Sequence, residues 1–397
     1  MQEGKSDPAS GTEWPPPLLI AWELTRSCPL RCVHCRAAAG RGPFEGEFTT
    51  AEALRFVDNV ASFAKPILIL TGGEPMLRAD FLEIARAAAD RGLRPVAAPC
   101  GALVTEQACR DMKDAGIQRI SLSIDGADAA SHDAFRGVPG AFEQVLAAAK
   151  AARATGLEFQ INTTVTRRNA ADLPRLLDLA LELGAVAFHP FLLVPTGRAA
   201  TMAAEEIPPD EYERVLGWLA ERRDVRGLEL KPTCAPHYNR VVRQAGGSLR
   251  GGHGRGPGHG HASGVGVPSR PGGRRPPVLG CLGGQGFAFV SHVGIVQICG
   301  FLDTPAGDLR ANGFDFHAIW RDAPLFQAMR RRAEYHGRCG VCEYRQVCGG
   351  CRARAFAMGG DALGEEPFCT HVPGRAVTDD TARGPEPRRP GAAGDVA

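Results

Sequence analysis

The sequence predicts an α/β fold: a partial (β/α)6 parallel barrel followed by a small C-terminal cysteine-rich domain. Residues 18–200 alternate short apolar runs with longer helical patterns, and such alternation is typical of parallel strands joined by helical crossovers. A complete eight-unit barrel takes about 250 residues, whereas the alternation ends near residue 225, so we expect an incomplete barrel. The segment 279–373 then carries seven of the chain's 13 cysteines and forms the second domain.

Six apolar runs are predicted as strands, and several are rich in Ile, Leu and Val, as parallel strands buried on both faces are. The predicted strands are 18–24, 67–71, 94–98, 118–124, 158–165 and 186–193. The helical patterns between them predict helices at 50–63, 79–91, 106–115, 141–155 and 173–183.

The ends of the predicted helices carry capping signals. Thr49 or Thr50 can cap the first helix, with Glu47 or Glu52 nearby. A left-handed residue, most often glycine, ends many helices. The glycines that follow the other four predicted helices are Gly92, Gly116, Gly156 and Gly184.

The chain divides by composition. The barrel is predicted at 18–230, with a bridging segment at 231–244. Residues 245–278 are rich in Gly, with Pro, Arg, His and Ser; because such a composition cannot bury a core, we expect a disordered linker. The cysteine-rich domain follows at 279–373, and the polar residues 374–397 are expected to be a disordered tail.

Composition also excludes classes of partner. Lys+Arg 46 against Asp+Glu 44 leave a net charge of +2, without the basic excess of a nucleic-acid-binding protein. No stretch approaches the ~18 uninterrupted apolar residues that a membrane helix needs. Residues 1–17 are polar and proline-rich, unlike a secretory signal, and are expected to be disordered. We therefore expect a cytoplasmic protein with no nucleic-acid partner and no membrane span.

Three cysteines directly follow the first predicted strand: Cys28, Cys32 and Cys35, in C-P-L-R-C-V-H-C. The reducing cytoplasm disfavours disulfides, so metal or redox chemistry is favoured. The carboxyl ends of barrel strands carry the active site. Three thiolates there can hold three corners of an iron–sulfur cubane and leave one iron open. A structural zinc with His34 as a fourth ligand is the alternative.

The second predicted strand ends in T-G-G-E-P, residues 71–75. Gly72 and Gly73 let a ligand approach the backbone closely, and Glu74 can accept hydrogen bonds from an ammonium group. Beside a three-cysteine loop at the end of the first strand, this turn indicates a ligand site.

These motifs resemble those of the radical S-adenosylmethionine (SAM) enzymes, which carry C-x3-C-x2-C after the first strand and G-G-E-P after the second. The resemblance implies a [4Fe–4S] cluster on the three cysteines, SAM on its open iron, and a 5′-deoxyadenosyl radical that abstracts a substrate hydrogen. Arg136 would pair with the SAM carboxylate. All residues implied to contact SAM are Gly72, Gly73, Glu74, Ser123, Asp125, Arg136 and Asn162. For the polar ones a capping or turn role is the alternative.

The C-terminal cysteines read C-x12-G-x4-C, then C-x2-C-x5-C-x2-C, then C after 17 more residues. This order resembles the SPASM extension of radical SAM enzymes, which carries auxiliary iron–sulfur clusters. The resemblance implies one cluster on Cys339, Cys342, Cys348 and Cys369. It assigns to the other cluster Cys281, Cys299 and Cys351, with either Cys234 as fourth ligand or a position open to substrate. The strand-like 287–296 predicts a hairpin that presents Cys281 and Cys299. A zinc ribbon would use only two C-x-x-C pairs.

Four longer strings are similar to one subfamily, the SAM-dependent heme synthases of the siroheme-dependent heme pathway. The strings lie at 188–198, 231–238, 280–287 and 348–358. The resemblance implies oxidative decarboxylation of two propionates of Fe-coproporphyrin III to vinyl groups, giving heme b. A tetrapyrrole substrate and an unidentified low-potential electron donor are then the partners.

Four residues are candidates for substrate binding. Arg198, after the sixth predicted strand, can form a bidentate pair with a propionate, and Arg240 is a second candidate. Cys234 and His237 can ligate the porphyrin iron. For each arginine a solvated salt bridge, and for the histidine a structural place in a turn, is the alternative.

Other functions fit parts of the pattern. Related radical SAM enzymes act on heme d1 precursors or on didecarboxysiroheme, and SPASM maturases act on peptides. Maturases usually add an N-terminal peptide-binding domain, for which the 17 residues before the first predicted strand are too few. A non-catalytic iron–sulfur carrier would not need G-G-E-P.

Overall fold

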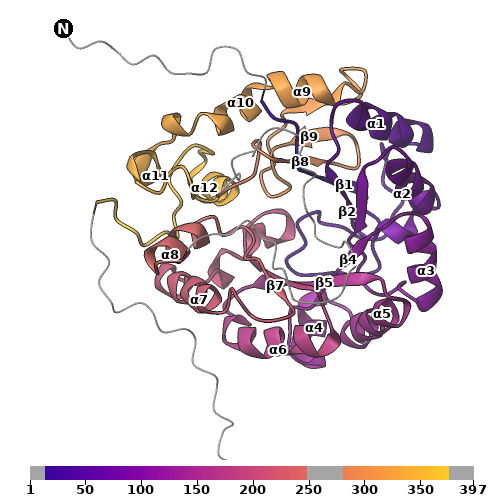
Figure 1. Ribbon diagram of the computed structural model, residues 1–397, viewed down its shortest axis with the longest axis horizontal. Helices are drawn as coiled ribbons and strands as arrows, with labels where there is room; N and C mark the ends of the chain where they lie inside the picture. Colours follow the sequence, from indigo (N-terminus) through magenta and orange to yellow (C-terminus); the bar gives the residue numbers. More distant parts are fainter. Residues whose placement is uncertain (1–13, 248–279, 375–397) are drawn as a thin grey trace, which may run out of the picture.

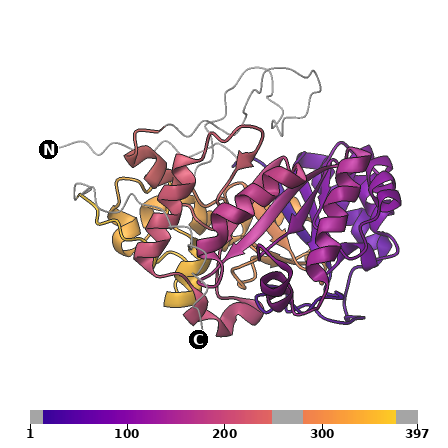
Figure 2. The same ribbon diagram turned by 90° about the horizontal axis from the view of Figure 1, so that it is seen from below.

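The computed structural model describes residues 14–247 and 280–374. Within these residues ten strands form one sheet in the order β10–β9–β8–β1–β2–β3–β4–β5–β6–β7, with helices around its outer side (Figures 1 and 2). The strands are β1 (Leu19–Thr25), β2 (Ile67–Gly72), β3 (Arg94–Ala97), β4 (Arg119–Ser123), β5 (Glu158–Val165), β6 (Ala187–Leu192), β7 (Glu229–Leu230), β8 (Phe287–Val290), β9 (Ile295–Gln297) and β10 (Gly307–Asp308).

The α-helices are α1 (Thr50–Phe63), α2 (Phe81–Asp90), α3 (Glu106–Asp114), α4 (Ala129–Arg136), α5 (Ala141–Thr155), α6 (Leu173–Leu183), α7 (Pro209–Glu221), α8 (Tyr238–Gln244), α9 (Phe316–Asp322), α10 (Pro324–Arg330), α11 (Gly337–Val341) and α12 (Arg352–Gly359). Short 3-10 helices lie at Pro75–Leu77, Ala170–Asp172, Gly197–Thr201, Ala203–Glu205 and Arg332–Glu334.

The predicted parallel α/β fold is confirmed. Each strand from β1 to β7 is parallel to the next, and the six predicted strands and five predicted helices lie within two residues of their expected bounds. The sheet is open, because β7 and β10 are its two ends. Three further elements within the predicted barrel range, the helices α4 and α7 and the strand β7, were not predicted.

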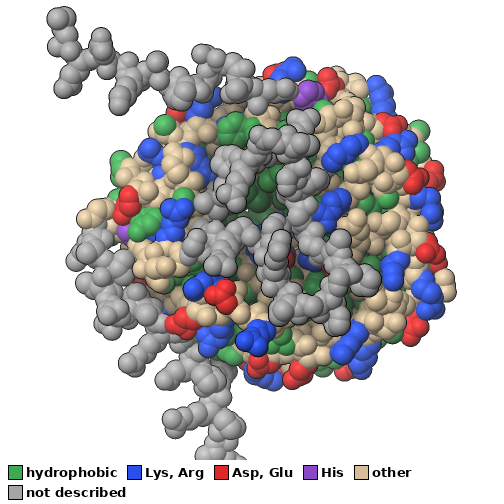
Figure 3. All heavy atoms as spheres, in the orientation of Figure 1, with side chains coloured by type: hydrophobic (Ala, Val, Ile, Leu, Met, Phe, Trp, Pro, Cys, Tyr) green, Lys and Arg blue, Asp and Glu red, His purple; other side chains and the backbone are tan. Residues whose placement is uncertain are grey.

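Alternation along the strands decides which side chains reach the interior of the barrel. In β5, Phe159 and Ile161 are buried and pack in the main core, whereas Gln160 and Asn162 on the other face are half-buried. The core between sheet and helices therefore takes the apolar face, and polar side chains face the inside of the barrel. Figure 3 shows basic and acidic side chains intermixed over one side of the molecule, with hydrophobic side chains in the hollow at its centre.

The predicted helix ends are also found. A capping box begins α1: the Thr49 hydroxyl accepts from the Glu52 N–H (3.3 Å), and the Glu52 carboxylate accepts from the Thr49 N–H (2.9 Å). The four glycines predicted after the other helices all have positive φ, between 65° and 85°.

The C-terminal region continues the sheet of the barrel. β8 pairs in parallel with β1, with Leu19 opposite Phe287 and Trp22 opposite Val290. The predicted hairpin is present, because β9 returns antiparallel to β8 around a turn that contains Gly294 at φ 89°. Cys281 precedes this hairpin and Cys299 follows it.

Some predicted segments lie outside the described residues: nearly all of the linker 245–278 and the tail 374–397, and most of the N-terminal segment 1–17. Among the helices that are described, none combines the length and the apolar character needed to cross a membrane.

The capping box of α1 gives a stability prediction. Thr49→Ala removes the side-chain acceptor of an otherwise unpaired N–H, so the free energy of unfolding should fall by about 1 kcal/mol. The control is Ser62→Ala on the same helix, whose hydroxyl bonds only the Asn59 carbonyl in the last turns. Urea unfolding followed by circular dichroism measures both; equal losses would contradict the capping role.

Candidate active site

The three N-terminal cysteines lie in one cluster of apolar side chains in the loop after β1. Cys28 and Cys32 are buried, Cys35 is half-buried, and all three pack with Leu30, Ala37 and Ala39. The Ala39 N–H lies 3.4 Å from Cys35 Sγ. The Cys100 thiol packs against the same cluster of side chains, and none of these cysteines is paired as a disulfide. The three thiols of the loop suit an iron–sulfur cluster with three protein ligands.

Arg198 holds this loop from the other side of the barrel. Its Nε donates to the Cys32 carbonyl (2.8 Å) and its Nη1 to the Ala39 carbonyl (2.6 Å). Gly197 is required beside it, since a Cβ there would lie 2.1 Å from the Arg36 carbonyl oxygen. The binding of a substrate carboxylate by Arg198 stays a prediction; in the structure its guanidinium positions the main chain of the cysteine loop.

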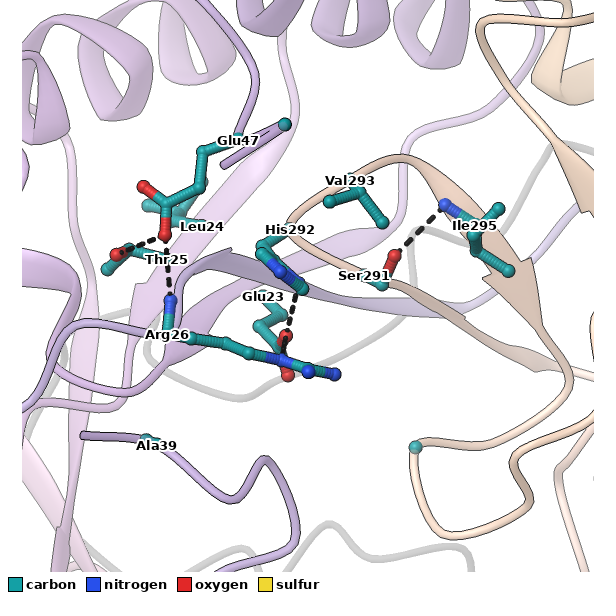
Figure 4. Close-up of polar contacts among 12 residues, drawn as sticks. Glu23, Leu24, Thr25, Arg26, Ala39, Glu47, Ser291, His292, Val293 and Ile295 are labelled. Carbon is teal, nitrogen blue, oxygen red and sulfur yellow. Dashed lines mark hydrogen bonds and ion pairs between the residues drawn. The ribbon is translucent and has the colours of Figure 1, made fainter. Parts of the chain in front are cut away.

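A buried carboxylate anchors both ends of the same loop. Glu23 of β1 is fully buried and pairs with Arg26 (2.9 Å) and with His292 (2.8 Å) from the turn between β8 and β9 (Figure 4). It also pairs with Arg36. Burial raises the pKa of Glu23, but the His292 hydrogen bond and the charges of Arg36 and Arg26 outweigh it and hold the pKa at about 2. The carboxylate therefore stays ionised.

The two glycines of T-G-G-E-P serve a close approach between main chains. A Cβ at Gly72 would lie 2.2 Å from the Thr25 carbonyl oxygen, and a Cβ at Gly73 would lie 2.3 Å from that of Ser27. From the sequence we expect this freedom to serve an approaching ligand. The structure adds a different cause, since the backbone after β1 occupies the space that a side chain would need.

Glu74 is fully buried and caps the turn that follows. Its Oε1 accepts from the Met76 N–H (2.9 Å) and its Oε2 from the Cys100 N–H (2.6 Å). Burial raises the pKa of Glu74. The capping role named as the alternative is thus present, and each oxygen keeps capacity for a further donor.

An ion pair joins the end of β4 to the cysteine loop. Arg136, the last residue of α4, pairs with the buried carboxylate of Asp125, and its Nη1 lies 3.6 Å from Cys32 Sγ. The other carboxylate oxygen of Asp125 accepts from the Thr164 N–H (2.6 Å). The main chain of Arg136 also accepts from the Arg31 N–H (3.1 Å). Arg136 therefore supports the loop and brings a positive charge to the thiols.

Ser123 of β4 and Asn162 of β5 lie side by side in the sheet. His189 of β6 continues their row and was not predicted from the sequence. The register places Ser123 opposite Asn162, and Asn162 opposite His189 of β6. Gln160 donates from Nε2 to Asn162 (2.9 Å) and to His189 Nδ1 (3.0 Å), which leaves the His189 proton on Nε2. Burial, with the charges of Lys231 and Arg119, lowers the pKa of His189 to about 3, so the ring is neutral. The alternation of side chains between the two faces of β5 and β6 is the sequence signal that could have identified His189.

Four C-terminal cysteines line one cavity. They are the four that the resemblance assigned to one auxiliary cluster: Cys339, Cys342, Cys348 and Cys369. His237 and Arg240 line the same cavity. Both ring nitrogens of His237 and Nε of Arg240 are buried without a partner among the described residues. A buried unpaired polar group costs about 1–3 kcal/mol, so these atoms fit a cavity that is filled by an acceptor such as cluster sulfur.

Arg240 and His237 lie together at this cavity, and their roles as substrate residues stay predictions. Both Nη atoms of Arg240 bind the Glu213 carboxylate (2.7 and 2.6 Å). His237 is fully buried and stacks on Tyr212, with ring centroids 4.6 Å apart, beside the four cysteines.

A mixed group of ligand atoms borders the cavity. The sulfur of Cys342, a carboxylate oxygen of Glu343 and a ring nitrogen of His371 lie within 4.8 Å of one another. Sulfur, oxygen and nitrogen donors of this kind also suit zinc. Because the group shares Cys342 with the four-cysteine cavity, we treat it as part of the same site.

Four further cysteines form a second group: Cys234, Cys281, Cys299 and Cys351. A Cβ at Gly283 would lie 3.6 Å from Cys281 Sγ and 3.7 Å from Cys299 Cβ, so these two residues are close together. Burial raises the pKa of Cys234, and the neighbouring thiols of Cys351, Cys299 and Cys281 raise it further. Cys234 has a left-handed backbone at φ 57°, and its carbonyl accepts from Tyr212 Oη (3.2 Å). The Cys234 thiol therefore lies near those of Cys281, Cys299 and Cys351, the three cysteines assigned to the second auxiliary cluster.

Comparisons with known proteins find relatives over most of the chain. Residues 22–180 match the Radical SAM superfamily model. The chain is 49% identical to the AdoMet-dependent heme synthase of Nitratidesulfovibrio vulgaris, covering 90% of this chain and 93% of that protein. It is 48% identical to the protein of that name from Methanosarcina barkeri (90% and 98%). It is 31% identical to the pre-heme d1 synthase of Dinoroseobacter shibae (91% and 87%).

A solved structure supports the fold. Streptococcus suis SuiB bound to S-adenosylmethionine superposes with a TM-score of 0.65 at 15% identity, covering 89% of this chain and 77% of that one. At this identity the likeness shows a shared architecture.

The packing of T-G-G-E-P against the cysteine loop can be tested. Gly73→Ala places a Cβ 2.3 Å from the Ser27 carbonyl and 2.8 Å from that of Arg26; such overpacking costs about 1–3 kcal/mol, so the unfolding temperature should fall. The control is Gly40→Ala in the same loop, where a Cβ meets nothing within 4 Å. Differential scanning calorimetry compares them, and an unchanged midpoint for Gly73→Ala would refute the steric account.

Proposed function

Because the chain belongs to the radical SAM superfamily and, within it, to the family of AdoMet-dependent heme synthases, we propose that it converts two propionates of Fe-coproporphyrin III into vinyl groups and so makes heme b. The observation that carries the proposal is the 49% identity over nine-tenths of both chains. The identity to the pre-heme d1 synthase is only 31%, which makes heme b formation the better choice.

The N-terminal centre would bind SAM. Cys28, Cys32 and Cys35 hold the [4Fe–4S] cluster, which with SAM supplies the 5′-deoxyadenosyl radical that removes a hydrogen from the propionate β-carbon. Arg198 and Arg136 keep the loop in place through the main-chain and sulfur contacts described above.

The polar residues around this centre divide the binding of SAM between them. We assign its amino group to the edge formed by Gly72, Gly73 and Glu74. Ser123 and Asn162 contact SAM from inside the barrel. Asp125 acts through its ion pair with Arg136.

The chemistry of the substrate explains why further metal centres are needed. After loss of the β-hydrogen, the side chain –CH•–CH2–COO⁻ becomes –CH=CH2 and CO2, and one electron leaves per propionate. We assign its acceptor to auxiliary clusters, one on the four cysteines of the cavity and one on Cys281, Cys299, Cys351 and Cys234. The grouping of Cys234 with the three others supports a complete set of four thiolates.

Two alternatives differ in substrate. A related tetrapyrrole enzyme would process a heme d1 precursor or didecarboxysiroheme, and a peptide maturase would modify a peptide with the same radical. Both would keep the N-terminal centre, so the substrate assay separates them. The electron donor is a low-potential reductant of unassigned identity, and a cytoplasmic location follows from the proposed chemistry of reduced thiols.

The assignment of the N-terminal centre gives a first prediction. Changing Cys28, Cys32 and Cys35 together to Ala should lower 5′-deoxyadenosine formation to background, because the open iron is lost, while the C-terminal cysteines still bind iron. The control is Cys109→Ala, because Cys109 is a buried residue of α3 that belongs to none of the three cysteine groups. Chromatographic detection of 5′-deoxyadenosine with dithionite as reductant is the measurement, and full activity of the triple variant would disprove the assignment.

The function itself is tested by product analysis. Incubated anaerobically with Fe-coproporphyrin III, SAM and dithionite, the holoenzyme should release two CO2 per porphyrin. A monovinyl intermediate should appear first, since each decarboxylation consumes one SAM. Mass spectrometry follows both porphyrins. Turnover of didecarboxysiroheme or of a peptide without any vinyl product would transfer the chain to one of the alternatives.

A further inference from the structure

The cavity of Cys339, Cys342, Cys348 and Cys369 is rich in N–H donors. Four of them already contact cysteine sulfur. They are the main-chain N–H groups of Tyr344, Gly350 and Glu366, each 3.4 Å from Sγ, and the Arg352 guanidinium at 3.6 Å. Sulfur in this cavity is therefore surrounded by partial and full positive charge.

His237 adds a donor that has no partner among the described residues. Its side chain is fully buried, lines the cavity and leaves both ring nitrogens without a hydrogen bond. Stacking on Tyr212 fixes the ring plane. An imidazole carries at least one N–H in every protonation state, so the ring always offers a donor.

Arg240 is arranged in the same way. Both of its Nη atoms donate to the Glu213 carboxylate, which neutralises the charge of Arg240 and fixes its guanidinium. The remaining Nε–H is buried, lines the same cavity and is also without a partner in the described part of the chain. Two independent side chains thus present unpaired N–H groups at one place.

The second cysteine group has a different environment. Among the described residues, one N–H contacts a sulfur of this group: that of Phe301, 3.4 Å from Cys299 Sγ. The Glu366 carboxylate, which accepts from the Cys351 N–H (2.8 Å), is paired with Arg354 (3.2 Å) and also lines the four-cysteine cavity, so its charge does not distinguish the two groups. Fewer N–H donors to sulfur stabilise the reduced state of a cluster less.

We propose that His237, with Arg240, donates N–H···S hydrogen bonds to the cluster on Cys339, Cys342, Cys348 and Cys369, and thereby gives it a higher reduction potential than the cluster of the second group. The inference rests on the auxiliary clusters of the proposed function. Hydrogen bonds to cluster sulfur stabilise the more negative, reduced state and so raise the potential. The cluster in the cavity is then the destination of the electron that each propionate loses.

The test measures potentials, which a purely structural role would not move. His237→Phe keeps a ring against Tyr212 and removes the N–H, whereas His237→Gln restores an N–H donor. Both are made in the full chain that carries Ala at 28, 32 and 35, so that only auxiliary clusters give signals. Iron is counted, and each couple is titrated by electron paramagnetic resonance, with the second cluster as internal reference.

In His237→Phe the reduced-to-oxidised ratio of one cluster should fall about tenfold at fixed potential, which is about 59 mV for a one-electron couple. The reference cluster should not change, iron should be retained, and His237→Gln should recover most of the shift. Unchanged potentials with full iron would overturn the inference and leave the proposed function intact. Loss of iron in both variants would also overturn it, because His237 would then be a ligand or a structural residue. If the parent protein, with Ala at 28, 32 and 35, held no iron, the assignment of the auxiliary clusters would itself be wrong.

Discussion

One buried carboxylate, Glu23 at the end of β1, joins the two cysteine-bearing parts of the chain. It binds Arg26 and Arg36 at the two ends of the N-terminal cysteine loop, and His292 in the C-terminal hairpin. Arg36 continues the link, since it stacks on Phe289 and donates to the carbonyl next to Cys299. With a pKa held at about 2, the carboxylate is charged above its ordinary value of 4.5. Its contribution to stability is therefore complete in that range and is lost as the pH falls toward 2.

A buried guanidinium makes the second connection, at the end of β6. Arg354 of α12 donates to the carbonyls of Leu192 and Leu193 (3.2 and 2.7 Å) and to that of Cys234 (3.2 Å), and it pairs with Glu366 (3.2 Å). Removal of one member of such a buried pair would leave an uncompensated charge, which is strongly destabilising. Charge pairs inside the protein, rather than chain connectivity, thus fix the second cysteine group against the barrel.

Local patterns in the sequence were enough to predict most helices and strands of the barrel. They were not enough to predict the partners of charged side chains. β5 lies at its predicted bounds because strict alternation sets both its type and its face. Arg198 was recognised as a residue beside the site, but its two carbonyl acceptors come from a loop about 160 residues away, and no local pattern encodes such a choice. His189 was overlooked because its role depends on the register between strands. The helix α4 was missed because it is short and polar, although Asp128 caps it.

The pairing of β1 with β8 has a consequence for how the chain folds. Leu19 and Phe287 are neighbours in the sheet but are separated by on the order of 270 residues. At a synthesis rate of 5–20 residues per second, one edge of β1 stays unpaired for roughly 13–54 s after it leaves the ribosome. An unpaired, apolar strand edge is a template for association with other chains, and such distant parallel pairing forms slowly. We therefore expect the nascent chain to associate with other chains more readily before its C-terminal hairpin has been made than after.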